Sequence, residues 1–420
     1  MKILIAPWGN PGEWTQVTYE FNEKRIKSGT SLKILQEIVN PDKTIVIGLD
    51  TLAEKGRNYQ EIKVNAKEKI NKYAHKFGLV NYEVLVAPGI GTSPNGTFYG
   101  NALDYYYYII AKISLKLLEN HKNTLNLYLD LTHGINYSTI LTYRAIKEII
   151  RLFSIFKKVE FRAYNADPFI RKANPDKLSI NIVEDSVPIP VPFTEKITQG
   201  RPLEPVNLSP DEREELFKNE LKGIQEINNS EVSAFIGALY NGLPLALFRF
   251  YPNKDKLKET IPQVLECYKK YIDVKKQDKL EVVRRLRIGK DFKVYVFAYL
   301  IATLLRDLEL ISSQKKEITL DEIEKVKEDL FKFDERFKIR IDDDIYTLKK
   351  DLKEKEIKGW KIYNEVLGRG IGEPDARNFL AHSGFEKNII EAKKEDGKLM
   401  LRYRESKIET IADLCQRGLQ

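Results

Sequence analysis

The sequence is poor in cysteine, methionine and histidine. Its two cysteines, Cys267 and Cys415, are too few and too far apart to indicate a disulfide framework or a cysteine-based zinc site. Such a composition is typical of a reducing interior, and we expect a cytoplasmic protein. The four histidines stand at positions 75, 121, 133 and 382. Because this spacing is unlike that of metal ligands, we predict no metal site.

Long apolar runs are missing as well. The most apolar helix candidate, residues 294–305, is short and is soon followed by Arg306 and Asp307. Since a bilayer span needs about 20 apolar residues, we expect no membrane partner. Residues 1–7 have the pattern of a short strand and lack the apolar stretch of a signal peptide.

Charge, in contrast, is plentiful. Asp, Glu, Lys and Arg make up 31% of the chain, and the formal net charge is +8. A net positive charge suits a polyanionic partner such as nucleic acid. With 420 residues, the chain is long enough for two or three domains.

The first 185 residues alternate between strand and helix patterns. Helix patterns cover residues 102–118 and 137–156. Between the helices lie short runs that are apolar on both faces, as in a parallel sheet covered by helices. The strand candidates are residues 2–6, 44–49, 82–87, 125–131, 159–164 and 178–183. Repeated β–α units predict a doubly wound, Rossmann-like α/β domain, which we place at residues 1–190.

Prolines and then helices follow. The prolines of residues 186–210 predict a linker or an extended edge segment, after which Ser209 and Pro210 begin a helix. A second short helix ends near residue 241, and the pair resembles a helix-turn-helix, so residues 191–250 form the middle segment. Further helices are expected near 257–273, 279–287, 291–310, 319–333, 343–366 and 374–382, with a hairpin in 389–404. The last domain, residues 251–420, is therefore predicted to be all-α.

Three loops follow strands at the edge where an open parallel sheet binds its ligands. They combine glycine with small hydroxyl or amide side chains, and the third runs into a helix whose amides can face an anion. None is a Walker loop or a full GxGxxG, which disfavours ATP and NAD. The residues predicted to touch a ligand are Asn10 in the first loop, Thr92, Ser93 and Asn95 in the second, and Thr132, His133 and Gly134 in the third.

Simpler interpretations of these features stay open. The glycines can serve only tight turns, His133 can be a structural histidine, and Trp14 can be either a platform for a base or a lid on the core. The helix over 137–156 is apolar round much of its circumference. That pattern fits a dimer interface near the loops or a deep core.

Residues 373–384 carry the motif with the most chemical content. We expect Pro374 to begin a short helix that presents Arg377, Asn378 and His382 in one polar region. RNA cleavage by transesterification uses the neighbouring 2′-OH as nucleophile. A histidine can move the proton, and an arginine can stabilise the phosphoryl charge.

This motif is small. A single Arg and a single His are more plausible as half of a composite site, formed where two copies meet at a dimer axis. The alternative is that Arg377 serves only as an ion-pair partner of Asp375 or Glu373.

Taken together, the loop Asp130–Gly134 on a Rossmann-like domain and the later helical domain with Arg377, Asn378 and His382 resemble the CRISPR-associated CARF–HEPN ribonucleases of type III systems. The resemblance covers essentially the whole chain. It is closest to the archaeal subfamily with a helix-turn-helix segment between the two domains, to which residues 241–245 are also similar.

The resemblance implies a specific function. The CARF domain would bind a cyclic oligoadenylate, usually cyclic tetra-adenylate in this subfamily, across the two-fold axis of a homodimer or an assembly of dimers. The type III effector complex makes this activator, and no stable binding to that complex is required. The HEPN domain would then cut single-stranded RNA without metal, leaving 2′,3′-cyclic phosphates, with Arg377 and His382 catalytic and Asn378 supporting.

Two other functions remain open. A ligand-responsive transcription regulator would use the helix-turn-helix-like segment to bind DNA, although residues 209–247 are rich in acids. A CARF domain that also cleaves its own cyclic ligand would use Thr132 or His133 to position a 2′-OH.

Overall fold

The computed structural model describes residues 1–119, 122–170, 172, 175–276 and 278–420, so His121 lies outside the described residues. The chain divides into two compact units, each built from three separate stretches. Unit 1 comprises Met1–Ile189, Pro202–Glu220 and Gln263–Lys290. Unit 2 comprises Pro190–Arg201, Leu221–Pro262 and Asp291–Gln420. The predicted domain limits remain predictions.

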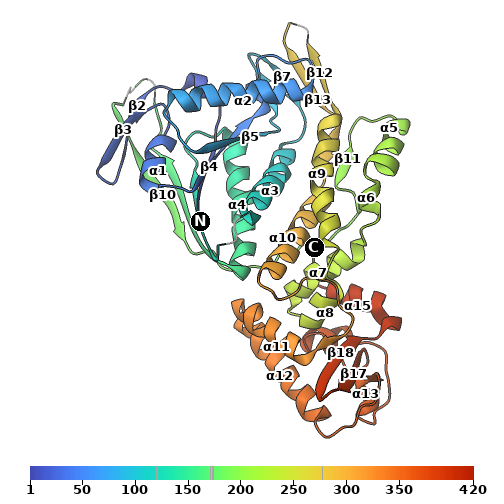
Figure 1. The fold of residues 1–420 in the computed structure, drawn as a ribbon. Coiled ribbons are helices and arrows are strands. Elements are labelled where there is room, and N and C mark those ends of the chain that lie inside the picture. The colour runs from blue at the N-terminus through green and yellow to red at the C-terminus, as the bar shows by residue number, and fades with distance from the viewer. Residues whose placement is uncertain (120–121, 171, 173–174, 277) are drawn as a thin grey trace. The chain divides into compact units, whose positions relative to one another are not determined.

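Unit 1 contains an eight-stranded sheet in the order β3-β2-β10-β9-β8-β1-β4-β5 (Figure 1). Five neighbouring strands, from β9 to β5, run parallel. The strands are β1 (Lys2–Pro7), β2 (Val17–Phe21), β3 (Lys24–Ser28), β4 (Lys43–Leu49), β5 (Tyr82–Ala87), β8 (Thr124–Asp130), β9 (Lys158–Ala166) and β10 (Lys177–Ser186). All six strands predicted in this region are confirmed, as is the Rossmann-like α/β class.

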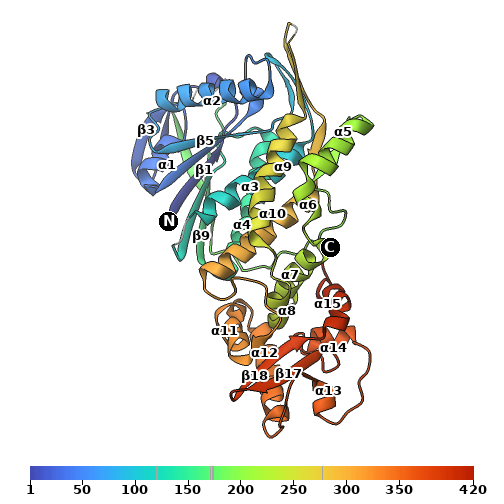
Figure 2. The same cartoon turned by 45° about the vertical axis from the view of Figure 1, so that its right-hand side comes forward.

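Four helices cover this sheet on its two faces. They are α1 (Leu32–Val39), α2 (Tyr59–Lys76), α3 (Ala102–Leu118) and α4 (Asn136–Phe156). Right-handed crossovers that step from β1 toward β5 place α1 and α2 on one face. The steps from β5 back toward β9 place α3 and α4 on the other face, where they pack against each other (Figure 2). The two helix predictions are confirmed.

The far edge of the sheet differs from the predicted parallel arrangement. Strand β10 is antiparallel to β9, and β2 and β3 form a hairpin that joins β10. In β2, Val17, Tyr19 and Phe21 are buried while the residues between them are more exposed. This alternation is typical of a half-buried strand. The surrounding sequence is polar and has no β–α repeat, so the strand was not predicted.

Two smaller sheets complete unit 1 and correct one helix prediction. The first has the order β12-β13-β7-β6, and the second pairs β11 with β14. The strands are β6 (Gly91–Ser93), β7 (Gly96–Tyr99), β11 (Leu203–Pro205), β12 (Ile272–Lys276), β13 (Leu280–Arg284) and β14 (Leu286–Ile288). The helix predicted at 279–287 is therefore wrong. Leu280, Val282 and Arg284 are buried at every second position, and the buried Arg284 hid that period in the sequence.

The segment predicted to resemble a helix-turn-helix is divided between the units. Ser209 caps α5 (Pro210–Glu214) as predicted, because its hydroxyl accepts a hydrogen bond from the Glu212 amide. The remaining helices of the segment are η3 (Glu215–Glu220), a π-helix in unit 1, and α6 (Lys222–Gln225), α7 (Asn229–Asn241) and α8 (Pro244–Arg249) in unit 2. Helix α9 (Lys254–Lys270) then runs from unit 2 into unit 1.

Unit 2 is mostly helical and carries one small sheet, in the order β15-β18-β17-β16 (Figure 2). Its further elements are α10 (Lys290–Asp307), β15 (Ile318–Thr319), α11 (Leu320–Asp329), η4 (Phe331–Phe333), α12 (Glu335–Leu352), β16 (Lys361–Ile362), α13 (Tyr363–Val366), α14 (Ala376–Ala381), β17 (Ile390–Glu395), β18 (Lys398–Tyr403), η5 (Glu405–Lys407) and α15 (Ile408–Cys415). The terminal hairpin is confirmed, with Asp396 and Gly397 at positive φ in its turn.

One helix prediction in unit 2 is wrong in part. The expected helix over 343–366 ends at Leu352 and resumes only as the short α13, because the stretch 353–360 is mostly charged and buries a single apolar side chain, Ile357. Among the residues described, none of the helices combines the length and the apolar character that crossing a membrane requires.

Candidate functional site

In unit 2, helix α14 presents the predicted catalytic motif. Its N-cap is Asp375, whose carboxylate accepts a hydrogen bond from the Asn378 amide at 2.7 Å, so Pro374 precedes the helix rather than beginning it. The side chains of Arg377 and Asn378 are exposed. Phe379 is fully buried and anchors the helix.

His382 stands at the C-cap of α14 and contacts an acid from another helix. Its Nδ1 lies 3.0 Å from Oδ1 of Asp344 on α12. Burial raises the pKa of the Asp344 carboxyl, and hydrogen bonds from His382 and Ser383 oppose that rise. An ionised carboxylate can only accept, so Nδ1 is the donor of this hydrogen bond and Nε2 is the ring nitrogen left without this partner.

Hydrogen bonds from Arg340 hold the turn that follows His382. Arg340, one helical turn before Asp344, donates from Nε to the Ser383 hydroxyl at 3.1 Å. The same guanidinium donates to the carbonyl oxygens of Asn241 and Gly242 at the end of α7. Three separate parts of the sequence thus meet behind the histidine.

A cavity of about 600 Å³ opens beside this arrangement, and its lining includes His382, Asp344, Arg340 and Tyr363. Sequence reasoning missed Asp344 and Arg340. Both lie in a helix with several acids and bases at similar spacing, and no local signal separates Asp344 from its neighbours Asp342 and Asp343. Within the described part of the chain, no group of three or more His, Cys, Asp or Glu residues is placed to hold a metal ion.

In unit 1, the structure brings the first and third predicted loops together. The Gly9 amide donates to the His133 carbonyl oxygen at 2.7 Å. Asn10, in the same loop, accepts from the Gly12 amide and donates to Glu13, so it shapes its own turn.

His133 is held as a neutral ring. Its Nε2 accepts a hydrogen bond from the Ser31 amide at 3.4 Å and lies 3.0 Å from the Tyr19 hydroxyl. Burial lowers the pKa of His133 to about 3. The ring centroid is 4.1 Å from that of Trp14, which itself stacks on Phe77. Trp14 therefore packs on its neighbours over at least one face.

Thr132 and Gly134 shape the start of α4. The Thr132 amide donates to the buried Asp130, and its hydroxyl accepts from the Ala166 amide at 3.1 Å. A Cβ added to Gly134 would lie 2.0 Å from Oγ1 of Thr139 in the first turn of α4. A larger residue at position 134 therefore requires the Thr139 side chain to move.

The second predicted loop is a hairpin, β6–β7. Ser93 and Asn95 make its turn, since the Asn95 amide donates to the Ser93 hydroxyl, and Thr92 contacts Thr97 across the hairpin. The Asn95 carbonyl accepts from Leu280 of β13. Among the described residues, no hydrogen bond or ring contact joins these three side chains to the first and third loops.

A buried ion pair that sequence reasoning missed lies at the same sheet edge. Asp50, directly after β4, pairs with Arg284 of β13, and both side chains are fully buried. Asp50 also accepts from the Gly89 amide and the Tyr59 hydroxyl. The sequence signal that could have identified Asp50 is an acid directly after an apolar strand, a position that Asp130 also occupies.

The comparisons with known proteins agree with this layout. Residues 3–168 match the family model described as "CRISPR system endoribonuclease Csx1, CARF domain", and residues 312–405 match the model of the HEPN domain of the same endoribonuclease. The chain is thus a CARF–HEPN protein, as the motifs predicted.

A full-length relative supports the same assignment. The "CRISPR system endoribonuclease Csx1" of Methanocaldococcus jannaschii is 32% identical, over 97% of this chain and 92% of the relative. The chain therefore belongs to the Csx1 family of CRISPR system endoribonucleases. A solved structure, protein VC1899 from Vibrio cholerae, aligns at 11% identity over 72% of this chain and 66% of that one, with a TM-score of 0.23. A TM-score this low does not show that the two folds are alike.

Proposed function

We propose that this chain is a metal-independent endoribonuclease that a cyclic oligoadenylate activates, and that it cuts single-stranded RNA in type III CRISPR defence. The observation that carries the chemical half of the proposal is the hydrogen bond between His382 and Asp344. It fixes the imidazole so that Nε2, and not Nδ1, is available to substrate.

In the proposed reaction, Nε2 of His382 takes the proton of a ribose 2′-OH while that oxygen attacks the adjacent phosphorus. The bond to the 5′-oxygen breaks, and the products carry a 2′,3′-cyclic phosphate and a 5′-hydroxyl. Asp344 stabilises the imidazolium that forms, and Arg377 stabilises the charge on the phosphoryl oxygens. Asn378 is proposed to support the same phosphate.

The active form is proposed to be a homodimer or an assembly of dimers. One Arg377 and one His382 provide a single base and a single cation, whereas cleavage also needs an acid for the leaving 5′-oxygen. In unit 1, three apolar side chains near the starts of α3 and α4 favour self-association: Ile140 is 67% exposed, Leu103 40% and Ile135 36%.

The ligand half of the proposal rests on the CARF assignment and on the start of α4. The Ser138 amide of its first turn donates to the Ile135 carbonyl, which leaves the amides of Asn136 and Tyr137 to face a ligand; Gly134 lets a ligand approach them, so the site favours phosphate. Thr132, His133 and Asn10 are proposed contacts beside it, with His133 offering a neutral ring face. Thr92, Ser93 and Asn95 are the weaker assignments, since they belong to the β6–β7 hairpin.

Ring cleavage by the same loops finds little support. Nε2 of His133 accepts from the Ser31 amide and contacts the Tyr19 hydroxyl, so that nitrogen is occupied and unavailable as a base. We therefore retain binding, and not cleavage, of cyclic tetra-adenylate as the proposed role of these loops.

The proposal is tested by RNA cleavage with and without cyclic tetra-adenylate, in the wild type and in His382→Ala. Cleavage should need the activator, persist in EDTA and disappear in the variant, while the variant still binds activator in calorimetry. Arg377→Ala should behave in the same way. Full cleavage by His382→Ala, or products with 5′-phosphates, would contradict the mechanism.

A further inference from the structure

A second cavity in unit 1 has no role in the function proposed above. It measures about 500 Å³ and lies beside β5, the outermost strand of the large sheet, between α2, α3 and the end of α9. Its lining includes five lysines: Lys63, Lys67, Lys112, Lys116 and Lys269. We call this feature the lysine cavity.

The positive charge of the lysine cavity is only partly neutralised. Lys116 pairs with Glu83, and Lys269 pairs with Glu266. In the described ranges, no carboxylate lies within ion-pair distance of Lys63, Lys67 or Lys112.

Burial and the nearby Lys269 and Lys112 lower the pKa of Lys63 to about 8. Burial and Lys269 also lower the pKa of Lys112. Glu266 and Glu83 oppose these shifts only in part, so holding the ammonium groups together costs folding free energy, which a bound anion would recover.

We propose that the lysine cavity binds a compact polyphosphate anion, such as the triphosphate group of a nucleotide. Ammonium groups from α2, α3 and α9 surround one volume, so several phosphate oxygens can be bound at once. The cavity lies within the usual size range of small-ligand sites, about 300–1,000 Å³. The proposal does not depend on ribonuclease activity, and the lysine cavity shares no lining residue with the predicted ligand loops.

A competing explanation is that the lysines only protect a free sheet edge. In the described part of the chain, no strand pairs with β5 on its outer side, and lysines near such an edge discourage pairing with other chains. That explanation predicts no anion affinity, and it predicts aggregation when the lysines are removed.

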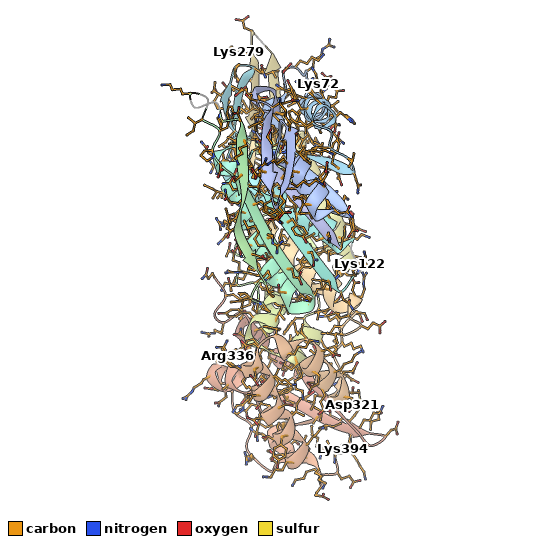
Figure 3. The ribbon with its side chains drawn as sticks, turned by 90° about the vertical axis from the view of Figure 1, so that its left-hand side faces the viewer. Lys72, Lys122, Lys279, Asp321, Arg336 and Lys394 are labelled. Carbon is orange, nitrogen blue, oxygen red and sulfur yellow. The ribbon has the colours of Figure 1, made fainter. Side chains whose placement is uncertain are left out.

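The test is isothermal titration calorimetry of the full-length protein with inorganic tripolyphosphate at constant ionic strength. Wild type should bind one equivalent, and Lys63→Gln/Lys112→Gln should weaken binding by a factor on the order of ten or more. The matched control is Lys72→Gln/Lys279→Gln, which removes the same charge. Figure 3 shows Lys72 on α2 and Lys279 at the tip of the β12–β13 hairpin, both at the outer surface. The control should stay within about twofold of wild type.

A second readout separates anion binding from a structural role. An anion beside Lys63 raises its pKa, so binding at pH 8 should take up protons, and the binding enthalpy should change with the ionisation enthalpy of the buffer. The proton uptake should be lost in Lys63→Gln. The other charged groups lining the cavity or pairing within it are Lys67, Lys112, Lys116, Lys269, Glu83, Glu119 and Glu266.

Thermal melts complete the test. Without ligand, Lys63→Gln/Lys112→Gln should melt at or above the wild-type temperature, because two repelling charges are gone. If that variant fails to fold, the exposed Lys67→Gln replaces it, with the same weakening expected. The proposal is overturned if wild type does not bind tripolyphosphate, if the substitutions leave affinity unchanged, or if only an RNA oligonucleotide binds.

Discussion

The contact between Asp344 and His382 allows a prediction that separates catalysis from stability. We expect Asp344→Asn to slow activated RNA cleavage while the protein stays folded. The variant keeps the shape of the side chain but removes the charge that faces Nδ1 at 3.0 Å. Hydrogen bonds to charged groups contribute about 1.5–3 kcal/mol. If that contribution acts on the imidazolium of the transition state, the rate falls by a factor of roughly 10–150.

The thermal stability of Asp344→Asn, in contrast to its cleavage rate, should not fall. Burial raises the pKa of Asp344 above its ordinary value, so the stability that this group contributes is present at low pH and is lost as pH rises through the folded-state pKa. Ionisation of the Asp344 carboxyl is therefore a cost to folding. Asp344→Asn should melt no lower than wild type.

The assay is single-turnover cleavage of a fluorescent single-stranded RNA with saturating cyclic tetra-adenylate, paired with thermal melts. Asp329→Asn is the matched control, because Asp329 is exposed on α11, does not line the cavity beside His382, and its replacement removes the same charge. The control should keep wild-type cleavage. The reasoning is refuted if Asp344→Asn cleaves at the wild-type rate, or if its loss of activity only follows a loss of folded protein.

Three further predictions concern unit 1. The pKa of His133 is lowered to about 3, so the stability that this residue contributes is complete above pH 6.5 and falls as pH drops. Urea unfolding at pH 5 should therefore show roughly 2 kcal/mol less stability than at pH 7. His133→Asn should reduce that difference. Asp50→Asn leaves Arg284 buried without a counter-charge, and chemical unfolding should show a loss of about 3–5 kcal/mol; a loss below about 1 kcal/mol would contradict the buried pair. Gly134→Ala displaces Thr139 and should cost about 1–3 kcal/mol and weaken activator binding in calorimetry.

The parts of the fold that the sequence predicted have repeating periodicity. Apolar strands such as β4 and β8 alternate with long helices such as α4, and this pattern specifies a doubly wound sheet without long-range information. Strand β13 forms a local hairpin with β12, but its other contacts, which decide its burial, are distant in sequence. Its pairing with β7 and the burial of Arg284 against Asp50 are tertiary contacts, which leave no pattern in the local sequence.

The candidate site shows the same division. Arg377, Asn378 and His382 could be chosen because they share one short helix and carry the residue types that RNA cleavage needs. Asp344 could not, because its importance lies in one contact across 38 residues of chain. Likewise the first and third loops were correctly grouped by their place after parallel strands, whereas the second loop proved to be a hairpin that pairs with β13.

The order of the chain through the two units limits how this protein can be dissected. Each unit is assembled from three separate stretches, so no single cut yields either one whole. A fragment that stops at residue 190 lacks β13 and β14, and with them Arg284. Asp50 would then lose its counter-charge, and β7 would keep β6 but lose its other partner strand, β13. Failure of such a fragment to bind an activator would report a damaged sheet rather than an absent site, and point substitutions in the intact chain avoid that ambiguity.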